Sequence, residues 1–291
     1  MPRRDVAKWI DEAVALEVED AAATGAVGYM GRVLVQTTLP HSSAGAGPYY
    51  ERTNGKLTLT IMAPPRRGVP YGTYPRLVLA WLTTEAVRTR SRQVVLGDTL
   101  SEWLRELGLP RTGGARGTIA RLHDQMRRLF AATISVTYDN DRVSTEAGMR
   151  VADASVLWWD PKHPDDAGLW ESVVTLSERF FDEVTSRPVP ISVQALHHLK
   201  GSPLRLDLYC WLTYRMATLR RPTTIPWEAL ALQFGGDYRR IRDFKAKLLQ
   251  HLPYVLAVYR DAHVEDTAAG LLLRPSPTHI PPRAAQLLPG V

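Results

Sequence analysis

Two groups of polar side chains recur at helical spacing in the sequence. The first group is Thr118, Arg121, Gln125 and Arg128, and the second is Arg240, Asp243, Lys247 and Gln250. Within each group the intervals are three, four and three residues, so the side chains line one side of a helix. A helix fits the major groove of B-DNA, where Arg and Lys bind guanine edges and Gln binds adenine. The spacing therefore predicts two helices that recognise bases in double-stranded DNA.

Further basic residues flank both groups and extend the predicted surface. Cations that do not meet base edges are expected to contact phosphates, which set the position and much of the affinity. Asp124 and Asp243 argue against a purely phosphate-binding surface, since they pair with neighbouring arginines or accept hydrogen bonds from cytosine. The predicted DNA-binding residues are Arg111, Arg116, Thr118, Arg121, Gln125, Arg128, Tyr238, Arg239, Arg240, Arg242, Asp243 and Lys247.

A solvated, charged helix face is the alternative interpretation, and it is the better one for a single helix of this kind. Two such helices, each after a tight turn and before a pair of strands, favour DNA binding. The formal net charge of +6 agrees with an anionic partner but is a weak indication alone.

Motifs for catalysis and metal binding are missing from the sequence. There is no GxxxxGK[ST], HExxH or GxSxG pattern, which excludes the commonest phosphate-binding, zinc-protease and serine-hydrolase sites. His197 and His198 are adjacent, so on a helix they point in different directions and do not form a metal pair. Cys210 is the single cysteine, which excludes an internal disulfide and a Cys-rich zinc site. We expect a protein that is not an enzyme and that needs no cofactor and no metal.

The composition of the 291 residues is that of a globular protein, with 45% hydrophobic and 23% charged residues. This length fits two domains. No run approaches 18 apolar residues and the N-terminus lacks the apolar stretch of a secretory signal, so we expect no membrane segment and a cytoplasmic protein.

The elements expected around the first basic group follow the order of a winged helix-turn-helix. Helices are predicted from residue 74 onward, over 99–107 with Asp98 as its N-cap, and over 118–132. Strands over 134–138 and 151–158 follow and would form the wing. This order of helices and strands is typical of winged-helix domains.

The same order recurs in the second half of the chain. A helix over 204–219, a short strand over 223–225 and helices over 226–233 and 237–251 are predicted, and strands over 254–259 and 271–273 would form a second wing. Both halves also share the letters WLT, at Trp81 and at Trp211. We therefore predict an α+β fold of two tandem winged-helix domains of similar topology.

The expected domain limits divide the chain into four parts. They are an N-terminal extension over 1–56, winged-helix domains over 57–185 and 186–275, and a C-terminal tail over 276–291. The first 25 residues carry a short amphipathic pattern. Strand-like runs at 32–39 and 56–62 would support dimerisation or pack on the first domain, and the sequence does not separate these two roles.

Long segments of both halves resemble the plasmid-encoded RepA replication initiators. In the first half these are PYGTYPRLVLAWLTTEAVR (70–88), LGDTL (96–100), ELGL (106–109), TGG (112–114) and QMRRLF (125–130). In the second half they are PLRLDLYCWLTYR (203–215) and RPTTIPWEAL (221–230). The resemblance covers roughly residues 58–260 and is more specific than any short motif above.

The resemblance implies a function that the composition and spacing alone do not. Such initiators bind repeated sites (iterons) in a plasmid origin, help to open an adjacent AT-rich stretch and recruit a host replication initiator and helicase. Many also repress their own promoter as homodimers. The resemblance further implies a bacterial protein that is associated with the nucleoid or a plasmid. The alternative function is a winged-helix transcriptional repressor or autorepressor without a replication role. An origin nickase would need a metal pair and a catalytic tyrosine, and a protein-interaction scaffold would bind no DNA.

Overall fold

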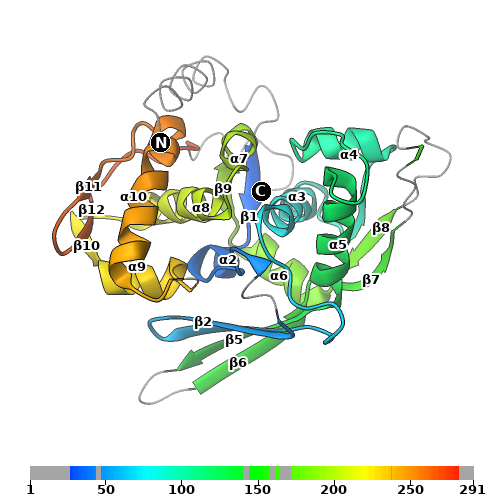
Figure 1. The fold of residues 1–291 in the computed structure, drawn as a ribbon, viewed down its shortest axis with the longest axis horizontal. Helices are drawn as coiled ribbons and strands as arrows, with labels where there is room; N and C mark the ends of the chain where they lie inside the picture. The colour runs from blue at the N-terminus through cyan, green and yellow to red at the C-terminus, as the bar shows by residue number, and fades with distance from the viewer. Residues whose placement is uncertain are drawn as a thin grey trace.

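The computed structural model describes residues 27–43, 47–139, 144–157, 162–163, 172–236 and 238–281. The predicted amphipathic segment over 1–25 lies outside these residues. The described chain is an α+β fold (Figure 1). None of its helices combines the length and the apolar character needed to cross a membrane.

The first half is built on three helices and a small sheet. They are α3 (Thr73–Thr89), β4 (Gln93–Val95), α4 (Leu100–Glu106), α5 (Thr118–Ala131), β7 (Ala152–Val156) and β8 (Val173–Leu176). The strands pair antiparallel in the order β4-β8-β7. Thr99, not Asp98, caps α4, since its side chain accepts a hydrogen bond from the Glu102 N–H, as N-cap hydroxyls commonly do.

The second half repeats this order of elements. It contains α8 (Pro203–Thr218), β10 (Thr223–Pro226), α9 (Trp227–Phe234), α10 (Ile241–Val258), β11 (Val264–Asp266) and β12 (Gly270–Leu273). Its sheet order is β10-β12-β11, so in both halves the first strand pairs with the third and the third with the second. The internal repeat predicted from the sequence is therefore present in the strand pairing.

The strand predicted over 134–138 does not pair with the segment 151–158. It is β5 (Thr133–Asp139), which lies between β3 (Leu57–Met62) and β6 (Ser144–Arg150) in a separate sheet ordered β2-β3-β5-β6. The edge strand β2 spans Tyr49–Asn54. Ile61 opposes Ile134 in the β3–β5 register, and both are fully buried. Burial of this apolar pair binds β5 to the N-terminal strands, so β7 pairs with β8 instead.

Two other predicted strands are helical. Residues 32–36 form the short helix α2 (Arg32–Gln36), which buries Leu34 and Val35. Residues 254–258 continue α10 past Pro253, because Tyr254 and Val255 extend the buried face of that helix. A short apolar run fits a buried helix as well as a strand, which explains both errors. In the second half, β11 pairs with β12 in place of the strand predicted over 254–259.

The described part of the predicted N-terminal extension is packed into the folded body. Strand β1 (Val27–Met30) pairs with β9 (Val189–Ser192). The Gln233 side chain donates to the Val35 carbonyl, and the Thr38 hydroxyl donates to the Gln233 carbonyl. The predicted tail also makes contacts, since Ile280 is buried in a small apolar cluster with Val27, Tyr29 and Val87. The domain limits themselves stay a prediction.

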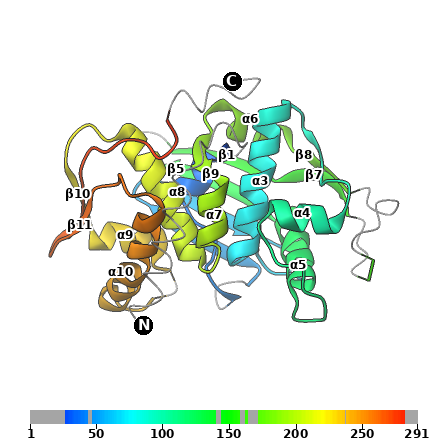
Figure 2. The same cartoon turned by 90° about the horizontal axis from the view of Figure 1, so that it is seen from above.

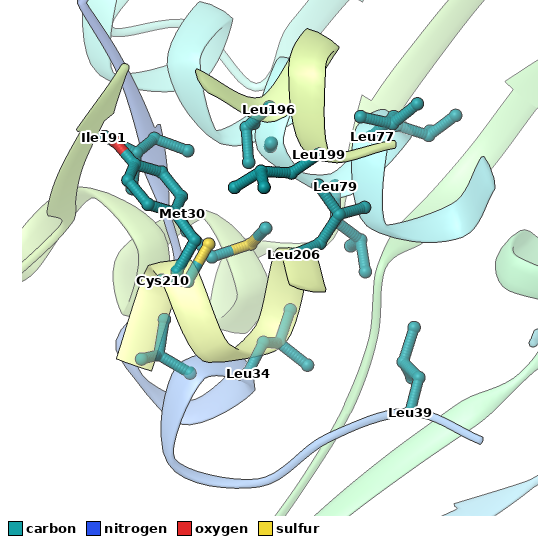
Figure 3. Close-up of a cluster of buried hydrophobic side chains, with 14 of the residues drawn as sticks. Met30, Leu34, Leu39, Leu77, Leu79, Ile191, Leu196, Leu199, Leu206 and Cys210 are labelled. Carbon is teal, nitrogen blue, oxygen red and sulfur yellow. The ribbon is translucent and has the colours of Figure 1, made fainter. Parts of the chain in front are cut away.

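One hydrophobic core joins the two halves. Figure 3 shows side chains of β1, α2, α3, α8 and α7 (Val193–Leu199) converging around Met30, Leu206 and Cys210. Within the same interface, the buried Arg76 of α3 donates to both carboxylate oxygens of Asp207 in α8, at 2.7 and 2.8 Å. Burial raises the pKa of the Asp207 carboxyl, but the Arg76 guanidinium and the His41 side chain lower it by more, so this pKa lies below its usual range. The halves are therefore joined by packing and by a buried ion pair.

Candidate nucleic-acid interface

Helix α5 is exposed along one side and buried along the other. Its buried residues include Ile119, Leu122, Met126, Leu129 and Phe130, the predicted apolar stripe. Arg121, Asp124 and Arg127 are exposed, and Arg128 is 21% exposed. Arg111 and Arg116 are exposed in the loop that leads into the helix. The helix thus presents several cations to solvent.

Thr118 and Gln125 do not belong to this exposed side, and the expectation that they face solvent is wrong. Their relative exposures are 2% and 4%. Thr118 hydrogen-bonds through its backbone N–H and hydroxyl to the Thr112 side chain. Gln125 Oε1 accepts a hydrogen bond from the Tyr71 N–H at 2.8 Å. Both side chains satisfy the polar groups of the loops packed against α5, so they stabilise the helix position.

Two arginines of α5, Arg121 and Arg128, are held by neighbouring side chains. Arg128 Nε lies 2.7 Å from Asp124 Oδ2, and its guanidinium lies over the Tyr71 ring at 5.3 Å. The Arg121 guanidinium lies over the Tyr74 ring at 5.8 Å. Of the two roles expected for Asp124, the structure shows pairing with an arginine. Stacking on aromatic rings orients a guanidinium at small entropic cost. Tyr71 and Tyr74 were not among the predicted site residues, because the spacing of residues in the sequence does not reveal that these rings lie beside the helix.

Helix α10 begins four residues later than predicted. Arg240 is its N-cap in an extended conformation, so Tyr238, Arg239 and Arg240 lie in the approach to the helix. Asp237 is outside the described residues. Gly235 lacks a side chain and ends α9, and the Tyr238 N–H donates to its carbonyl. This turn replaces the predicted first helical turn.

The predicted residues of the second group differ in exposure. Arg239, Arg240 and Asp243 are exposed, and the Arg242 side chain is 81% exposed. Lys247 is half-buried and donates to Gln250 Oε1 at 3.0 Å. Tyr238 is half-buried, with its ring 5.8 Å from that of Phe244.

Lys245 ties the β11–β12 hairpin to α10. Its Nζ lies 3.0 Å from Asp266 Oδ1 in β11 and 4.4 Å from the centre of the Trp227 ring. The ammonium is therefore used within the protein, which removes one of the flanking cations from the candidate surface. The contact fixes the hairpin beside the arginines at the start of α10.

The two basic helices lie on the same side of the molecule. In Figure 1 α10 and α5 stand at opposite ends, with α8 and α3 between them. In Figure 2 both lie along the lower edge, whereas α6 (Glu178–Ser186) lies toward the upper edge. The backbones of α5 and α10 therefore lie on one side of the molecule.

The cysteine and histidine side chains that were considered for metal or redox chemistry are packed within the fold. Cys210 is buried, and burial raises the pKa of its thiol. His197 Nε2 makes a hydrogen bond to the Glu106 carbonyl at 3.0 Å, and burial lowers the pKa of its imidazole. Within the described ranges, no three His, Cys, Asp or Glu residues are grouped so as to hold a metal ion.

Comparisons with known proteins agree with the earlier resemblance. The sequence model of the family described as plasmid-encoded RepA protein matches residues 69–229, more than half of the chain. Among solved structures, a crystal structure of selenomethionine derivatives of domains 2 and 3 of RctB is similar, with a TM-score of 0.55 and 12% identity. The similarity covers 83% of this chain and 95% of that one. At this identity it shows a shared fold. No curated protein sequence matches the chain.

Proposed function

This chain belongs to the family of plasmid-encoded RepA proteins, and from that premise we propose that it initiates plasmid replication by binding double-stranded origin DNA. The observation that carries the proposal is the pair of exposed, arginine-bearing helices, α5 and α10, on one side of the molecule. A helix with arginines at its N-terminal part is suited to the major groove.

Each half is proposed to act as a winged helix. The order helix, strand, helix, helix, hairpin and the repeated first-third-second strand pairing support this, because winged helices use that arrangement. In this proposal α5 and α10 enter major grooves about one helical turn apart. The tip of the β11–β12 hairpin and the arginines Arg111, Arg116 and Arg239 contact phosphates, which provide affinity but no sequence information.

The mechanism is mechanical and involves no covalent step. Binding to repeated sites (iterons) would bend the duplex, and the contact energy would offset the cost of deforming and locally opening an AT-rich neighbour. Recruitment of a host replication initiator and helicase, and repression of its own promoter as a homodimer, are further parts of the proposal. They rest on family membership.

The first test measures the affinity for repeated sequences flanking the coding region as salt is varied. If about eight phosphates are neutralised, log K falls with log salt at a slope of roughly −7. Arg242→Ala should weaken binding and flatten this slope. Arg187→Ala is the matched control, since Arg187 is exposed at the end of α6 on the opposite side. A slope near zero, or equal losses in both variants, contradicts the proposal.

A second test separates the initiator from a repressor that uses the same surface. Supplying the protein should allow a plasmid that carries only its repeats and the adjacent AT-rich stretch to replicate. Specific binding without plasmid maintenance would instead favour the repressor.

A further inference from the structure

A groove runs beside α5 where the two halves of the chain meet. Its volume is about 660 Å³, and its walls come from the start of α3, from α5 and from the turn between α7 and α8. Sites that hold small organic ligands have volumes of this order. The side chains that matter are Tyr71, Tyr74, Arg121, Asp124 and Lys200.

Two half-buried aromatic rings stand in the wall of the groove, and each already contacts a guanidinium. Tyr71 lies beneath Arg128 and Tyr74 beneath Arg121. Neither ring is fully enclosed, since both tyrosines retain exposed surface. Flat aromatic rings and guanidinium planes are the two protein groups on which a nucleobase stacks.

The lining of the same groove also includes cations and an acceptor. Lys200 Nζ donates to the Gly108 carbonyl, and an ammonium has three protons, so two remain for an anion. Arg121 is exposed and supplies a second positive charge. The exposed Asp124 carboxylate can accept from the amino group of a base edge. Ring, cation and acceptor together match the parts of a nucleotide.

We propose that this groove binds an unpaired nucleotide, with its base stacked on Tyr71 or Tyr74 and its phosphate bound by Arg121 and Lys200. A duplex does not suit the groove, because the faces of paired bases are covered by their neighbours in the stack. The ligand is a free mononucleotide or an exposed residue of single-stranded DNA. The inference rests on the proposed function, since an opened origin is the source of such a strand.

The test uses a fluorescein-labelled single strand of twelve thymidines and an origin duplex on the same protein preparations. The single strand should bind, and Tyr74→Leu should weaken it about ten-fold, the loss expected for one stacked base. Tyr74→Phe keeps the ring and should bind as the unmodified protein does. Tyr49→Leu is the matched control, because Tyr49 is an exposed tyrosine of β2. Competition by dTMP or ATP assigns the site to a free nucleotide, and its absence assigns it to the strand.

A second measurement needs no variant that could misfold. Single strands carrying 5-bromodeoxyuridine are irradiated with the unmodified protein, and the crosslinked peptides are identified by mass spectrometry. Crosslinks at Tyr71 or Tyr74 support the groove, whereas crosslinks confined to α10 or to the four-stranded sheet overturn it. If the protein binds duplex but neither the single strand nor mononucleotides, the inference fails alone. If it binds no duplex, the proposed function fails.

Discussion

Arg121 and Gln125 are one helical turn apart on α5, yet only one of them is available to a partner. Arg121 is exposed, whereas Gln125 is 4% exposed and accepts the Tyr71 N–H. The sequence predicted the apolar stripe of α5 correctly. It placed the opposite face wrongly, because the loops containing Thr112 and Tyr71 also cover the helix, and such loop contacts leave no periodic signal. The exposed side is centred on Asp124 and Arg127.

Substitutions at these two positions should therefore have different effects. Arg121→Ala should weaken duplex binding by roughly 1–3 kcal/mol if the arginine reads a base, and it should relax the preference at one base pair. Gln125→Ala should leave base preference unchanged and lower the free energy of unfolding by about 1–2 kcal/mol, because the Tyr71 N–H loses its acceptor. Anisotropy on single-base variants of the site and urea denaturation measure the two effects. A relaxed base preference in Gln125→Ala would contradict the assignment.

His279 gives the protein a stability that depends on pH. Burial lowers the pKa of its imidazole to about 4, and its Nδ1 lies 2.7 Å from the Tyr209 hydroxyl, which also accepts the Ser192 N–H. The unfolded chain has a histidine pKa near 6.5. Between these values the unfolded state binds more protons, so the stabilisation is complete above pH 6.5 and is lost as the pH falls toward 4. Urea denaturation across this range should show the loss.

The matched variant for this prediction is His279→Asn, which keeps a hydrogen-bonding side chain but cannot be protonated. Its free energy of unfolding should fall less steeply between pH 6.5 and 4. His251, whose pKa is also lowered to about 4 by burial and by the nearby Arg205, leaves a remaining slope in the variant. Identical slopes in the two proteins would show that His279 is not held neutral by the fold.

At the scale of elements, long periodic helices were predictable and short apolar runs were not. The helices α3, α5 and α8 lie close to their predicted limits. Helix α5 has a sustained apolar stripe, whereas α3 and α8 are buried on most sides and are recognised by the length of their mainly apolar runs. The run over 32–39 and the continuation of α10 past Pro253 depend on which surface covers them, which is tertiary information. The partner of β5 could not be read either, since its pairing with β3 joins segments about 75 residues apart.

The contact between α4 and α7 depends on a glycine. Gly108 has φ +65°, and a Cβ placed there would lie 2.4 Å from the His197 ring. The ring cannot easily withdraw, because its Nε2 is hydrogen-bonded to the Glu106 carbonyl. Gly108→Ala should therefore lower the free energy of unfolding by more than the roughly 1 kcal/mol of a left-handed alanine. Thermal and urea unfolding measure the change.

The double variant Gly108→Ala with His197→Ala separates the two causes. Removing the ring relieves the steric clash but not the backbone strain. The free energy of unfolding of the double variant should therefore fall by less than the sum of the losses in the two single variants. A purely additive result would show that the glycine and the histidine ring do not oppose one another across the α4–α7 contact.

At the scale of the whole molecule, the repeat was readable and the way its halves are joined was not. The order of elements and the shared WLT letters indicated a duplication. The sequence suggested an N-terminal extension followed by two tandem domains, and it gave no sign that β1 pairs with β9 or that one hydrophobic core spans both halves. Contacts between residues far apart in the chain, such as Arg76 with Asp207, carry no local pattern from which to predict them.

The shared core makes a prediction about the spacing of the DNA site. Packing and the Arg76–Asp207 ion pair fix α5 relative to α10. The protein therefore cannot contact both major grooves at once when extra base pairs increase the distance between them. Inserting 5 base pairs rotates one groove to the other side of the duplex, and inserting 10 restores the side but adds about 34 Å. Both insertions should reduce the affinity to that of a single half. Recovery with 10 base pairs would mean that the halves move independently.

The variant Arg242→Ala is the control for this test, because its contact with DNA through α10 is weakened. The same insertions should lower its affinity by a smaller factor. That result would assign the spacing requirement to simultaneous contact by both helices.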